Sequence, residues 1–273
     1  MALRLATLNL AFVDHNEGPG ADPERPAFPA WEARRERIVA AIAELAPEVV
    51  CLQEAVRWEA AAMAPRWRAW LAERLGAPLP ERYDQVADLA ARLPEYTVAG
   101  EPLPPSCYRD EEMAGFYWGT VVLSRLPVRR ARRLTLPQSP GDLTRRIPLF
   151  VEVEAEGEGF WVASVHCDPL ERHIEALCRE VRAIPERLGV ALLGDFNLDD
   201  RHPLYRRLLD CGLTDCRTAT EPALRWRPGA PCAPERTIDH CLLRHDHYRP
   251  AAFLHVNDYP YSDHHWLQVV DLV

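Results

Sequence analysis

The sequence predicts a mixed α/β sandwich, in which β-sheets pack face to face and helices cover their outer faces. Two observations favour this fold class. Short apolar segments with strand character outnumber segments with helical periodicity, and the 273 residues, 48% of them hydrophobic, suit one large core. No internal repeat, low-complexity tract or linker divides the chain. We therefore expect a single domain over residues 1–273.

The N-terminal part of the chain is expected to form a strand, a long loop, a helix and a second strand. Leucines alternate over residues 3–12, and residues 14–30 are rich in Gly, Pro, Asp and Glu, as is typical of a loop. Residues 31–45 place their apolar side chains on one helical face and end before Pro47. A buried strand is expected next, over residues 48–52.

The following segment is expected to be helical and then irregular. Residues 57–93 contain two helix-like stretches around a proline-bearing turn near residues 76–80. Residues 101–118 are rich in proline and are expected to form a loop before a strand over residues 119–124. This loop carries four aromatic side chains, Tyr108, Phe116, Tyr117 and Trp118.

The C-terminal half opens with a predicted antiparallel hairpin. Residues 150–156 alternate strictly between apolar and polar, and a glycine-bearing turn at residues 157–159 leads into a second strand over residues 160–166. The remaining expected elements are, in order, a helix over residues 169–188, a strand over 190–193, a helix over 203–209 and two strands over 237–243 and 266–272.

The charge of the chain limits the partners and mechanisms that are expected. The formal net charge is −9, so the chain lacks the basic footprint that neutralises a nucleic-acid backbone. All 32 basic residues are arginine, which excludes mechanisms that need a catalytic lysine, such as a P-loop or a Schiff base.

The cysteines and the hydropathy pattern indicate the compartment. Eight cysteines are scattered without a C-x-x-C pair or zinc-finger spacing, and several lie in apolar runs, where Cys acts as a small hydrophobic residue. The first residues do not resemble a signal peptide, and no apolar run is long enough to span a membrane. We expect reduced thiols, no membrane span, a cytoplasmic location and a monomer.

Acidic, amide and imidazole residues recur where the predicted strands end. Glu54 follows one buried strand, His166 ends another and Asp195 follows a third, and the ends of adjacent strands would bring them into one cleft. Each alone also fits a structural role, since Glu54 could cap a helix and residues 194–197 could form only a turn. The full set is Asn9, Gln53, Glu54, His166, Asp195, Asn197, Asp239, Asp263 and His264.

Taken together, these residue types match the needs of phosphate ester hydrolysis. That reaction requires a hard cation held by oxygen ligands, a positioned water, a proton donor for the leaving oxygen, and donors to the phosphate oxygens. The expected roles are metal ligand for Asn9, Glu54 and Asp263, base for Asp195, donor for His166 and His264, and orientation of an imidazole for Asp239.

Other site types fit the sequence less well. Residues 245–247 read His-Asp-His, but they follow a strand on a charged loop, which favours a solvated turn over a metal site. Residues 263–265 read Asp-His-His, but the upstream aspartate motifs of DHH-type phosphoesterases are missing. A serine hydrolase lacks its G-x-S-x-G turn, and a thiol enzyme built on Cys167 beside His166 is disfavoured because neighbouring strand residues point to opposite faces. The other histidines expected at the surface are His15, His173, His202 and His255.

The ordered set of motifs resembles the endonuclease/exonuclease/phosphatase superfamily, and the match spans nearly the whole chain. The most specific signals are G-D-F-N followed by S-D-H. In order, the motifs are T-L-N-L at residues 7–10, L-Q-E at 52–54, L-S-R followed by Pro around 124–127, S-V-H at 164–166, G-D-F-N at 194–197, I-D-H at 238–240 and S-D-H-H at 262–265.

The resemblance implies a four-layer αββα sandwich of two mixed β-sheets flanked by helices, with the active site where the two sheets meet at one edge. It also implies Mg²⁺ as the cofactor, or Mn²⁺ in its place. The implied roles are metal binding for Glu54, metal or phosphate binding for Asn9 and Asp263, activation of water for Asp195, phosphate contact for Asn197, donation to phosphate or leaving group for His166, and pairing of His264 with Asp239.

Substrate identity is the least specific part of the prediction, because one fold and one metal site serve several substrate classes. The acidic net charge favours a small or lipid-derived phosphoester or a nucleotide, with DNA or RNA cleavage as the alternative and a catalytically dead binding protein as a less favoured one. The aromatic loop at residues 108–118 and the segment at 225–227 would face the substrate, although ordinary packing explains them equally well. The predicted substrate contacts are Asn9, His166, Asn197 and Trp226.

Overall fold

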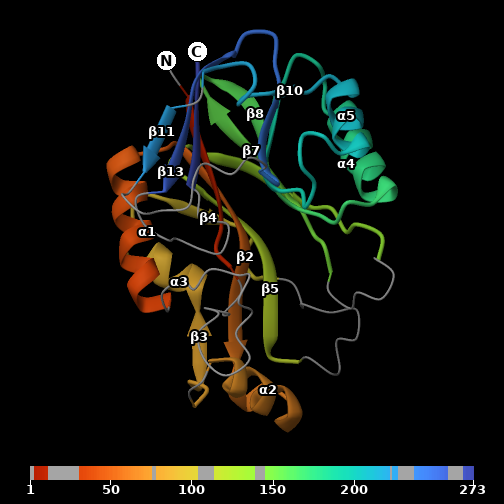
Figure 1. Cartoon of the computed structure of the whole chain (residues 1–273). Coiled ribbons are helices and arrows are strands. Elements are labelled where there is room, and N and C mark those ends of the chain that lie inside the picture. The colour runs from red at the N-terminus through yellow and green to blue at the C-terminus, as the bar shows by residue number, and fades with distance from the viewer. Residues whose placement is uncertain are drawn as a thin grey trace.

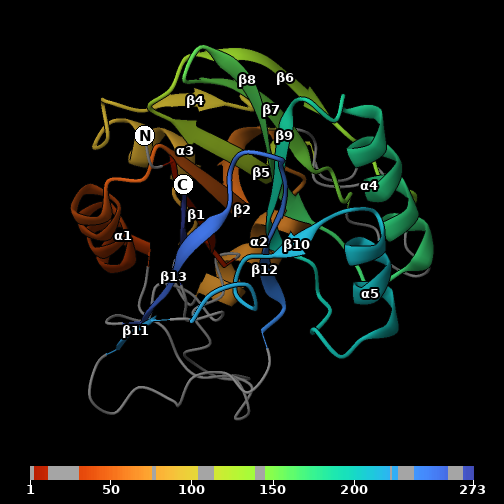
Figure 2. The same ribbon diagram turned by 90° about the horizontal axis from the view of Figure 1, so that it is seen from above.

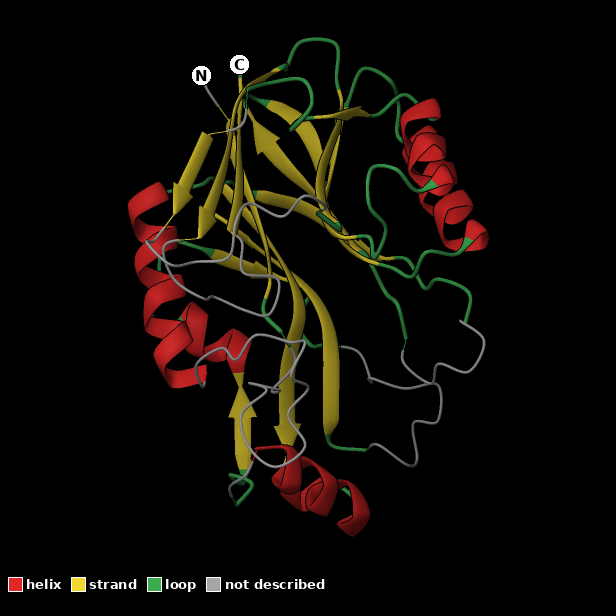
Figure 3. Cartoon of the chain, viewed as in Figure 1, coloured by secondary structure: helices red, strands yellow, loops and turns green. Residues whose placement is uncertain are grey.

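The structure is a computed structural model, and it is built on two β-sheets that lie face to face with helices on their outer sides (Figure 1; Figure 3). The structure describes residues 3–11, 31–75, 78–103, 114–138, 145–221, 223–226, 237–257 and 267–273.

The first sheet has eight described strands and is mixed. Its order is β11-β13-β14-β1-β2-β5-β4, with β3 paired to β2. Strand β1 lies between β2, to which it is parallel, and β14, to which it is antiparallel. The bounds are β1 Leu3–Asn9, β2 Val49–Glu59, β3 Arg82–Asp84, β4 Thr97–Ala99, β5 Phe116–Ser124, β11 Ala223–Trp226, β13 Pro250–Asn257 and β14 Leu267–Leu272.

The second sheet has six described strands, in the order β10-β12-β9-β8-β7-β6. Strands β8 and β9 are parallel and the other pairs are antiparallel. The predicted antiparallel hairpin is confirmed as β7 and β8. The bounds are β6 Val128–Arg133, β7 Leu149–Ala155, β8 Glu158–His166, β9 Gly189–Asp195, β10 Thr214–Asp215 and β12 Asp239–Arg244.

Helices flank both sheets, which confirms the four-layer αββα arrangement. Helices α1 and α3 cover the outer face of the first sheet, and α4 and α5 cover that of the second (Figure 1; Figure 2). None of the described helices is long and apolar enough to cross a lipid bilayer. The bounds are α1 Trp31–Leu45, α2 Pro65–Leu75, α3 Gln85–Ala90, α4 Glu171–Ala183 and α5 Pro203–Asp210, with one 3₁₀ turn at Ala60–Ala62.

The alternation of side chains along the central strands explains why the chain forms these layers. In β2, Val49 and Cys51 point into the layer between the sheets, whereas Val50 and Leu52 pack with Ile38 of α1 on the outer side. All five side chains are fully buried. Because successive residues of a strand point to opposite faces, a strand that is apolar at every position indicates burial on both sides.

Strands β2 and β5 continue beyond the second sheet as an arm, which the predicted boundaries miss. Phe116, Tyr117 and Trp118, predicted to lie in a loop, begin β5, and β2 runs seven residues past the expected end at residue 52. The two strands pair again after a break in register, with Trp58 opposite Phe116. The arm has an aromatic core of its own, which α2 helps to cover.

Candidate active site

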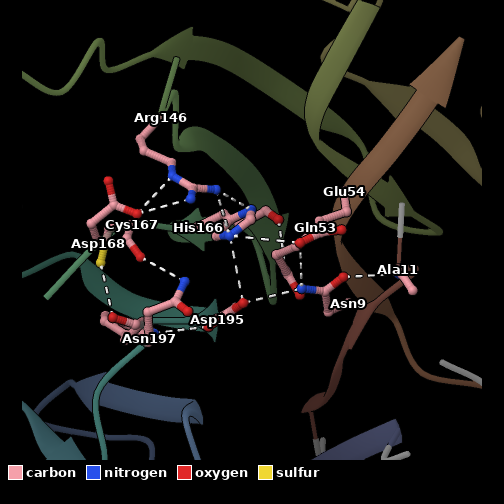
Figure 4. A network of polar contacts seen from close by, with 12 residues as sticks. Asn9, Ala11, Gln53, Glu54, Arg146, His166, Cys167, Asp168, Asp195 and Asn197 are labelled. Carbon is pink, nitrogen blue, oxygen red and sulfur yellow. Dashed lines mark hydrogen bonds and ion pairs between the residues drawn. The ribbon is translucent and has the colours of Figure 1, made fainter. Parts of the chain in front are cut away.

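Four strands, two from each sheet, bring polar side chains to one edge of the sandwich. Asn9 is the last residue of β1, His166 the last of β8 and Asp195 the last of β9, while Glu54 lies within β2. The pairing of β8 with β9 places His166 directly beside Asp195. Figure 4 shows Glu54, His166 and Asp195 turned toward one another, although more than a hundred residues separate the first of them from the second.

A bulge in β2 directs Glu54 into the site. Gln53 points between the sheets, so strict alternation would turn Glu54 toward the outer helices. The register with β5 shifts between Leu52 and Ala55, and Glu54 has φ +55°, a left-handed conformation that is uncommon for a residue with a side chain. Bulges of this kind re-aim a side chain next to active sites. The half-buried carboxylate consequently approaches His166.

The side chains of Glu54, His166 and Asp195 form a compact group. His166 Nε2 lies 3.5 Å from Asp195 Oδ2 and 3.9 Å from Glu54 Oε1. Asp195 and His166 are 1% and 5% exposed, so water screens their charges poorly. Two carboxylates at such depth require a cation or hydrogen-bond donors nearby.

These three side chains fit a divalent metal ion. Among the described residues, one ligand atom from each of Glu54, His166 and Asp195 lies within 4.8 Å of the other two. Carboxylate oxygens are the ligands that Mg²⁺ prefers, and an added imidazole is suited to transition metals such as Mn²⁺ or Zn²⁺. The sequence assigned only Glu54 of this group to the metal, so the geometry adds His166 and Asp195 as candidate ligands.

Asn9 holds the two carboxylates in place. Its Nδ2 donates to Asp195 Oδ2 at 3.1 Å and to Glu54 Oε1 at 3.4 Å, and its Oδ1 accepts from the Ala11 amide at 2.9 Å. The opposite amide orientation would set Nδ2 against the Ala11 N–H and Oδ1 against two carboxylates, so this network determines the orientation. In this arrangement Asn9 acts as a donor, and its expected role as ligand to metal or phosphate stays a prediction.

Asn197 tightens the turn that follows β9. Its main-chain N–H donates to Asp195 Oδ1 at 2.8 Å, and its Nδ2 donates to the Cys167 carbonyl at 3.0 Å. Asn197 has φ +53°, a conformation that Asn tolerates better than most residues. The turn leaves Asp195 with one oxygen occupied by the backbone and the other directed to Asn9 and His166. The expected contact of Asn197 with phosphate stays a prediction.

A buried cross-link beneath the site joins the two sheets. Gln53 accepts from Thr7 Oγ1 at 3.2 Å within the first sheet and donates to Ser164 Oγ of the second sheet at 2.9 Å. Ser164 in turn donates to the Leu52 carbonyl at 2.8 Å. Gly194 lies against this link with φ +138°, and a Cβ there would be 2.1 Å from the Val165 carbonyl oxygen. The site edge is therefore pinned across the sandwich.

Arg146 is a component of the site that the sequence motifs do not reveal. Its Nη1 donates to His166 Nε2 at 2.8 Å, while Nε and Nη2 both lie 2.9 Å from Asp168 Oδ1. The guanidinium carbon is 5.1 Å from the centre of the Trp118 ring, whose edge-on contact with the His166 ring spans 5.2 Å. The sequence offered one indication of this contact. Arg146 lies just before β7 and Asp168 just after β8, and the start of one strand of an antiparallel hairpin lies beside the end of the other.

Asp239 lies on the strand next to that of Asp195, and the side chains of three other predicted site residues are outside the part of the chain that the structure describes. Asp239 begins β12, is buried and pairs with Asp195 across the antiparallel ladder. Asp263 and His264 lie outside the described residues, as does the side chain of Trp226, whose backbone belongs to β11. The pairing of Asp239 with His264 and the metal role of Asp263 therefore stay predictions.

The described residues support neither a thiol enzyme built on Cys167 nor a metal site at residues 245–247. Cys167 is fully buried with its Sγ 3.6 Å from the Phe196 carbonyl, and burial raises the pKa of its thiol far above the range of a reactive cysteine. His245 uses Nδ1 to accept from the amides of His247 and Tyr248 at 2.8 and 2.7 Å, as a turn-stabilising residue does.

Two histidines expected at the surface are buried, which corrects the prediction. His173 of α4 is inaccessible because its ring bridges two loops, with Nδ1 accepting from the Asp168 amide and Nε2 2.6 Å from the Pro137 carbonyl. His255 of β13 is 5% exposed and faces the layer between the sheets with Phe253. Burial, followed by the charge of Arg217, lowers the pKa of His255 to about 4. His15 lies outside the described residues.

A family model described as the Endonuclease/Exonuclease/phosphatase family matches residues 6–264 of the chain. No curated protein matches the sequence.

Solved structures of that family share the fold. An endonuclease/exonuclease/phosphatase from Bacteroides vulgatus is 18% identical with a TM-score of 0.68, covering 100% of this chain and 99% of its own. The mannosyl-6-phosphatase of Bacteroides thetaiotaomicron is 17% identical, with a TM-score of 0.66 and 99% of both chains covered. TDP2 of D. rerio, complexed with a single strand DNA product, is 15% identical with a TM-score of 0.58, covering 100% of this chain and 99% of its own. At such identities the similarity establishes the fold alone.

Proposed function

The chain belongs to the endonuclease/exonuclease/phosphatase family, whose members are hydrolases acting on phosphate esters, and on this premise we propose a specific reaction for it. It hydrolyses a phosphomonoester or phosphodiester with Mg²⁺, by in-line attack of an activated water. One observation carries the proposal: Glu54, His166 and Asp195 come from both sheets and converge within 4.8 Å. We also propose that the whole chain forms one catalytic domain, monomeric and cytoplasmic.

The residues divide the work of the reaction between them. A divalent ion held by Glu54 and its neighbours supplies positive charge against the phosphate oxygens. Asp195, whose carboxylate accepts hydrogen bonds from Asn9 and from the Asn197 amide, takes the proton of the attacking water. In its protonated form His166 donates to a phosphate oxygen or to the leaving group, and its Nε2 is then neither a metal ligand nor an acceptor for Arg146. Asn9 holds the two carboxylates in place. His264, oriented by Asp239, is the second donor, with Asp263 as a further ligand.

The proposed substrate is a small or lipid-derived phosphoester or a nucleotide. The net charge of −9 works against the binding of a polyanion. The fold leaves the choice open, since its relatives include both a mannosyl-6-phosphatase and TDP2. Cleavage of DNA or RNA is the alternative, favoured if substrate binding weakens steeply with added salt. A catalytically dead binding protein is less favoured, because Glu54, His166 and Asp195 are all retained.

The test is metal-dependent turnover of the purified chain. We expect p-nitrophenyl phosphate or bis-p-nitrophenyl phosphate to be hydrolysed with Mg²⁺ or Mn²⁺ and to be spared when EDTA is present. Glu54→Gln should raise the Mg²⁺ concentration needed for half-maximal activity roughly tenfold or more, because a charged ligand is lost. Glu158→Gln, an exposed change at the opposite end of the sandwich, is the control. Absence of hydrolysis of both esters, of a nucleotide and of DNA would overturn the proposal.

A further inference from the structure

We propose that Cys178 of α4 and Cys211 at the C-terminal end of α5 are a redox-active pair of thiols, which a peroxide oxidises to a disulfide that ties the two helices together. The two helices lie side by side on the outer face of the second sheet (Figure 1; Figure 2). Neither cysteine belongs to the group formed by Glu54, His166 and Asp195. The thiol pair is therefore a second site, and it does not depend on the proposed hydrolysis.

Ion pairs between α4 and α5 fix how the two helices are aligned. Arg207 of α5 pairs with Glu171 and, at 3.7 Å, with Glu175 of α4. Cys178 is the next residue after Glu175 on that face of α4, and Cys211 lies one turn after Arg207. Both helices follow parallel strands, β8 and β9, and run in the same direction. The next contact along the two helices consequently joins the two cysteines.

The positions of the two sulfur atoms agree with this alignment. Cys178 Sγ donates to the Arg207 carbonyl at 3.5 Å, and Cys211 Sγ donates to the Leu208 carbonyl at 3.0 Å. Because these carbonyls belong to successive residues of α5, both sulfurs lie at the same turn of that helix. The thiols also form a hydrogen bond with each other when Cys211 is ionised and Cys178 donates. Such a contact is the close approach that a disulfide requires.

The surroundings of the pair favour ionisation of one thiol over the other. The hydrogen bond from Cys178, supported by the charges of Arg182 and Arg244 and opposed by burial, lowers the pKa of Cys211. The same hydrogen bond, together with burial, raises the pKa of Cys178. Arg244 is fixed near the pair because it donates to two carbonyls at the C-terminal end of α4. Since the thiolate is the reactive form of cysteine, Cys211 is the nucleophile of the pair.

Access to solvent separates the pair from the other cysteines of the described residues. Cys178 and Cys211 are 5% and 7% exposed, so a molecule as small as a peroxide can reach them. The other four are at most 2% exposed, and burial raises the pKa of each of their thiols. They are Cys51, Cys167, Cys216 and Cys241. Packing as small apolar side chains accounts for those four.

The oxidation consumes one hydrogen peroxide and leaves two water molecules. The Cys211 thiolate attacks one oxygen of the peroxide, the O–O bond breaks, and Cys211 becomes a sulfenic acid while the released hydroxide takes a proton. The sulfur of Cys178 then attacks that of Cys211. The S–S bond forms as the S–O bond breaks, and the thiol proton leaves with the hydroxyl group as water. Both sulfurs are oxidised and the peroxide is reduced.

The disulfide would stabilise the part of the second sheet that carries one side of the active site. It closes the segment between Cys178 and Cys211, which contains β9 with Asp195 and the turn at Asn197. A closed loop has less conformational freedom in the unfolded chain, so the folded state gains stability. In the reducing compartment proposed above, the pair rests as thiols and the disulfide forms transiently.

The experiment treats the purified protein with hydrogen peroxide, blocks the remaining thiols with iodoacetamide and maps its tryptic peptides. Trypsin cuts after arginine, so the disulfide joins residues 173–179 to residues 208–217. Cys216→Ala is the matched control, because it removes the other cysteine of the second peptide and should form the same cross-link. In both proteins we expect the cross-linked peptides and a thermal unfolding temperature raised by roughly 5–10 °C, each reversed by dithiothreitol.

Single variants test which thiol reacts first. Cys178→Ser should accumulate Cys211 as a sulfenic acid, which dimedone labels, whereas Cys211→Ser should leave Cys178 unlabelled. Neither variant should gain in unfolding temperature with peroxide. Alanine replaces serine at either position if the serine variant does not fold. Absence of the cross-linked peptides in the wild type, a cross-link that leaves its unfolding temperature unchanged, or equal dimedone labelling of the two variants would overturn the proposal and leave the proposed hydrolysis untouched.

Discussion

The two ends of the sandwich each carry histidine and acidic side chains, and they differ in what those side chains do. At the site edge, Glu54, His166 and Asp195 are brought together by strands of both sheets and are largely shielded from water. At the opposite end, which we call the far end, the turn at residues 156–158 and the loop at residues 245–248 carry exposed acids and the exposed His247, and the half-buried His245 accepts from two amides of its own loop.

This difference shows that residues brought together by strand pairing indicate a site better than residues that are adjacent in sequence. His-Asp-His at residues 245–247 is contiguous in sequence and has the composition of a metal motif, yet the first histidine uses Nδ1 to accept from the backbone amides of His247 and Tyr248. The residues of the site edge are scattered along the chain, and only the pairing of strands unites them. Burial of like charges against one another is costly in a fold and is kept where function needs it.

The largest expected difference between the two ends is in catalysis. Asp195→Asn should lower kcat on the order of 10³-fold, because an amide accepts no proton from water, while its shape keeps the hydrogen bond from the Asn197 amide. The thermal unfolding temperature should fall by a few degrees, because the new amide nitrogen faces Asn9 Nδ2, which donates to Asp195 Oδ2 in the wild type. Asp246→Asn at the far end should leave kcat unchanged. Hydrolysis of the preferred ester by Asp195→Asn at close to the wild-type rate would remove Asp195 from the role of base.

A smaller difference between the two ends is expected in the free energy of unfolding when one glycine at each end is replaced by alanine. Gly194→Ala should cost about 3 kcal/mol, because its Cβ would lie 2.1 Å from the Val165 carbonyl oxygen and 2.8 Å from Gln53 Nε2 at φ +138°. Gly157→Ala, with φ +84° but no atom within 4 Å, should cost about 1 kcal/mol. Urea denaturation measures both. Equal costs would mean that the cross-link beneath the site yields easily.

The smallest expected effect is an acid sensitivity that belongs to the site half of the molecule. The pKa of His255 is lowered to about 4 by burial and then by Arg217, against the partly compensating charges of Asp239 and Asp215. Between about pH 6.5 and pH 4 the unfolded chain binds more protons at this residue than the folded chain, so stability falls as the pH falls through that window. At pH 5 the loss relative to pH 8 should be about 2 kcal/mol.

Chemical denaturation across that window in the wild type and in His255→Gln measures the contribution of this residue. The variant should lose about 2 kcal/mol less on acidification from pH 8 to pH 5. His247→Gln, at the exposed far end, should behave as the wild type does. Identical pH profiles for wild type and His255→Gln would show that the ring is hydrated in solution.

Much of the fold was predictable because its periodicities are strong. Residues 31–45 form the expected helix to the residue, and the hairpin of β7 and β8 follows its glycine turn. Strand β6, Val128–Arg133, escaped prediction because an edge strand needs few apolar side chains, and four of its six residues are arginine. The start of β5 was missed because the two strands pair again after the register break in β2, and Phe116–Trp118 of that pairing fall within the segment that the sequence predicts as a loop.

The site was predictable where a polar residue interrupts or ends an apolar strand, and less so elsewhere. Glu54, His166 and Asp195 each interrupt or end a strand that is otherwise apolar and therefore expected to be buried, so their polar side chains are conspicuous in the sequence. Arg146 does not stand out, since the chain has 32 basic residues, all arginine, and only its contacts distinguish it. The burial of His255 could not be predicted for a similar reason, because its apolar and polar neighbours in the sequence do not indicate whether a single histidine is buried or exposed.

The position of β1 has a consequence for how the protein comes into being on the ribosome. Leu3–Asn9 is an inner strand whose antiparallel neighbour, Leu267–Leu272, is synthesised much later. Until that distant segment has been synthesised, one whole edge of β1 has no native partner, and its exposed amide and carbonyl groups can recruit other chains. Such late closure of a long loop favours slow folding and prolongs the time for which that edge of β1 is exposed.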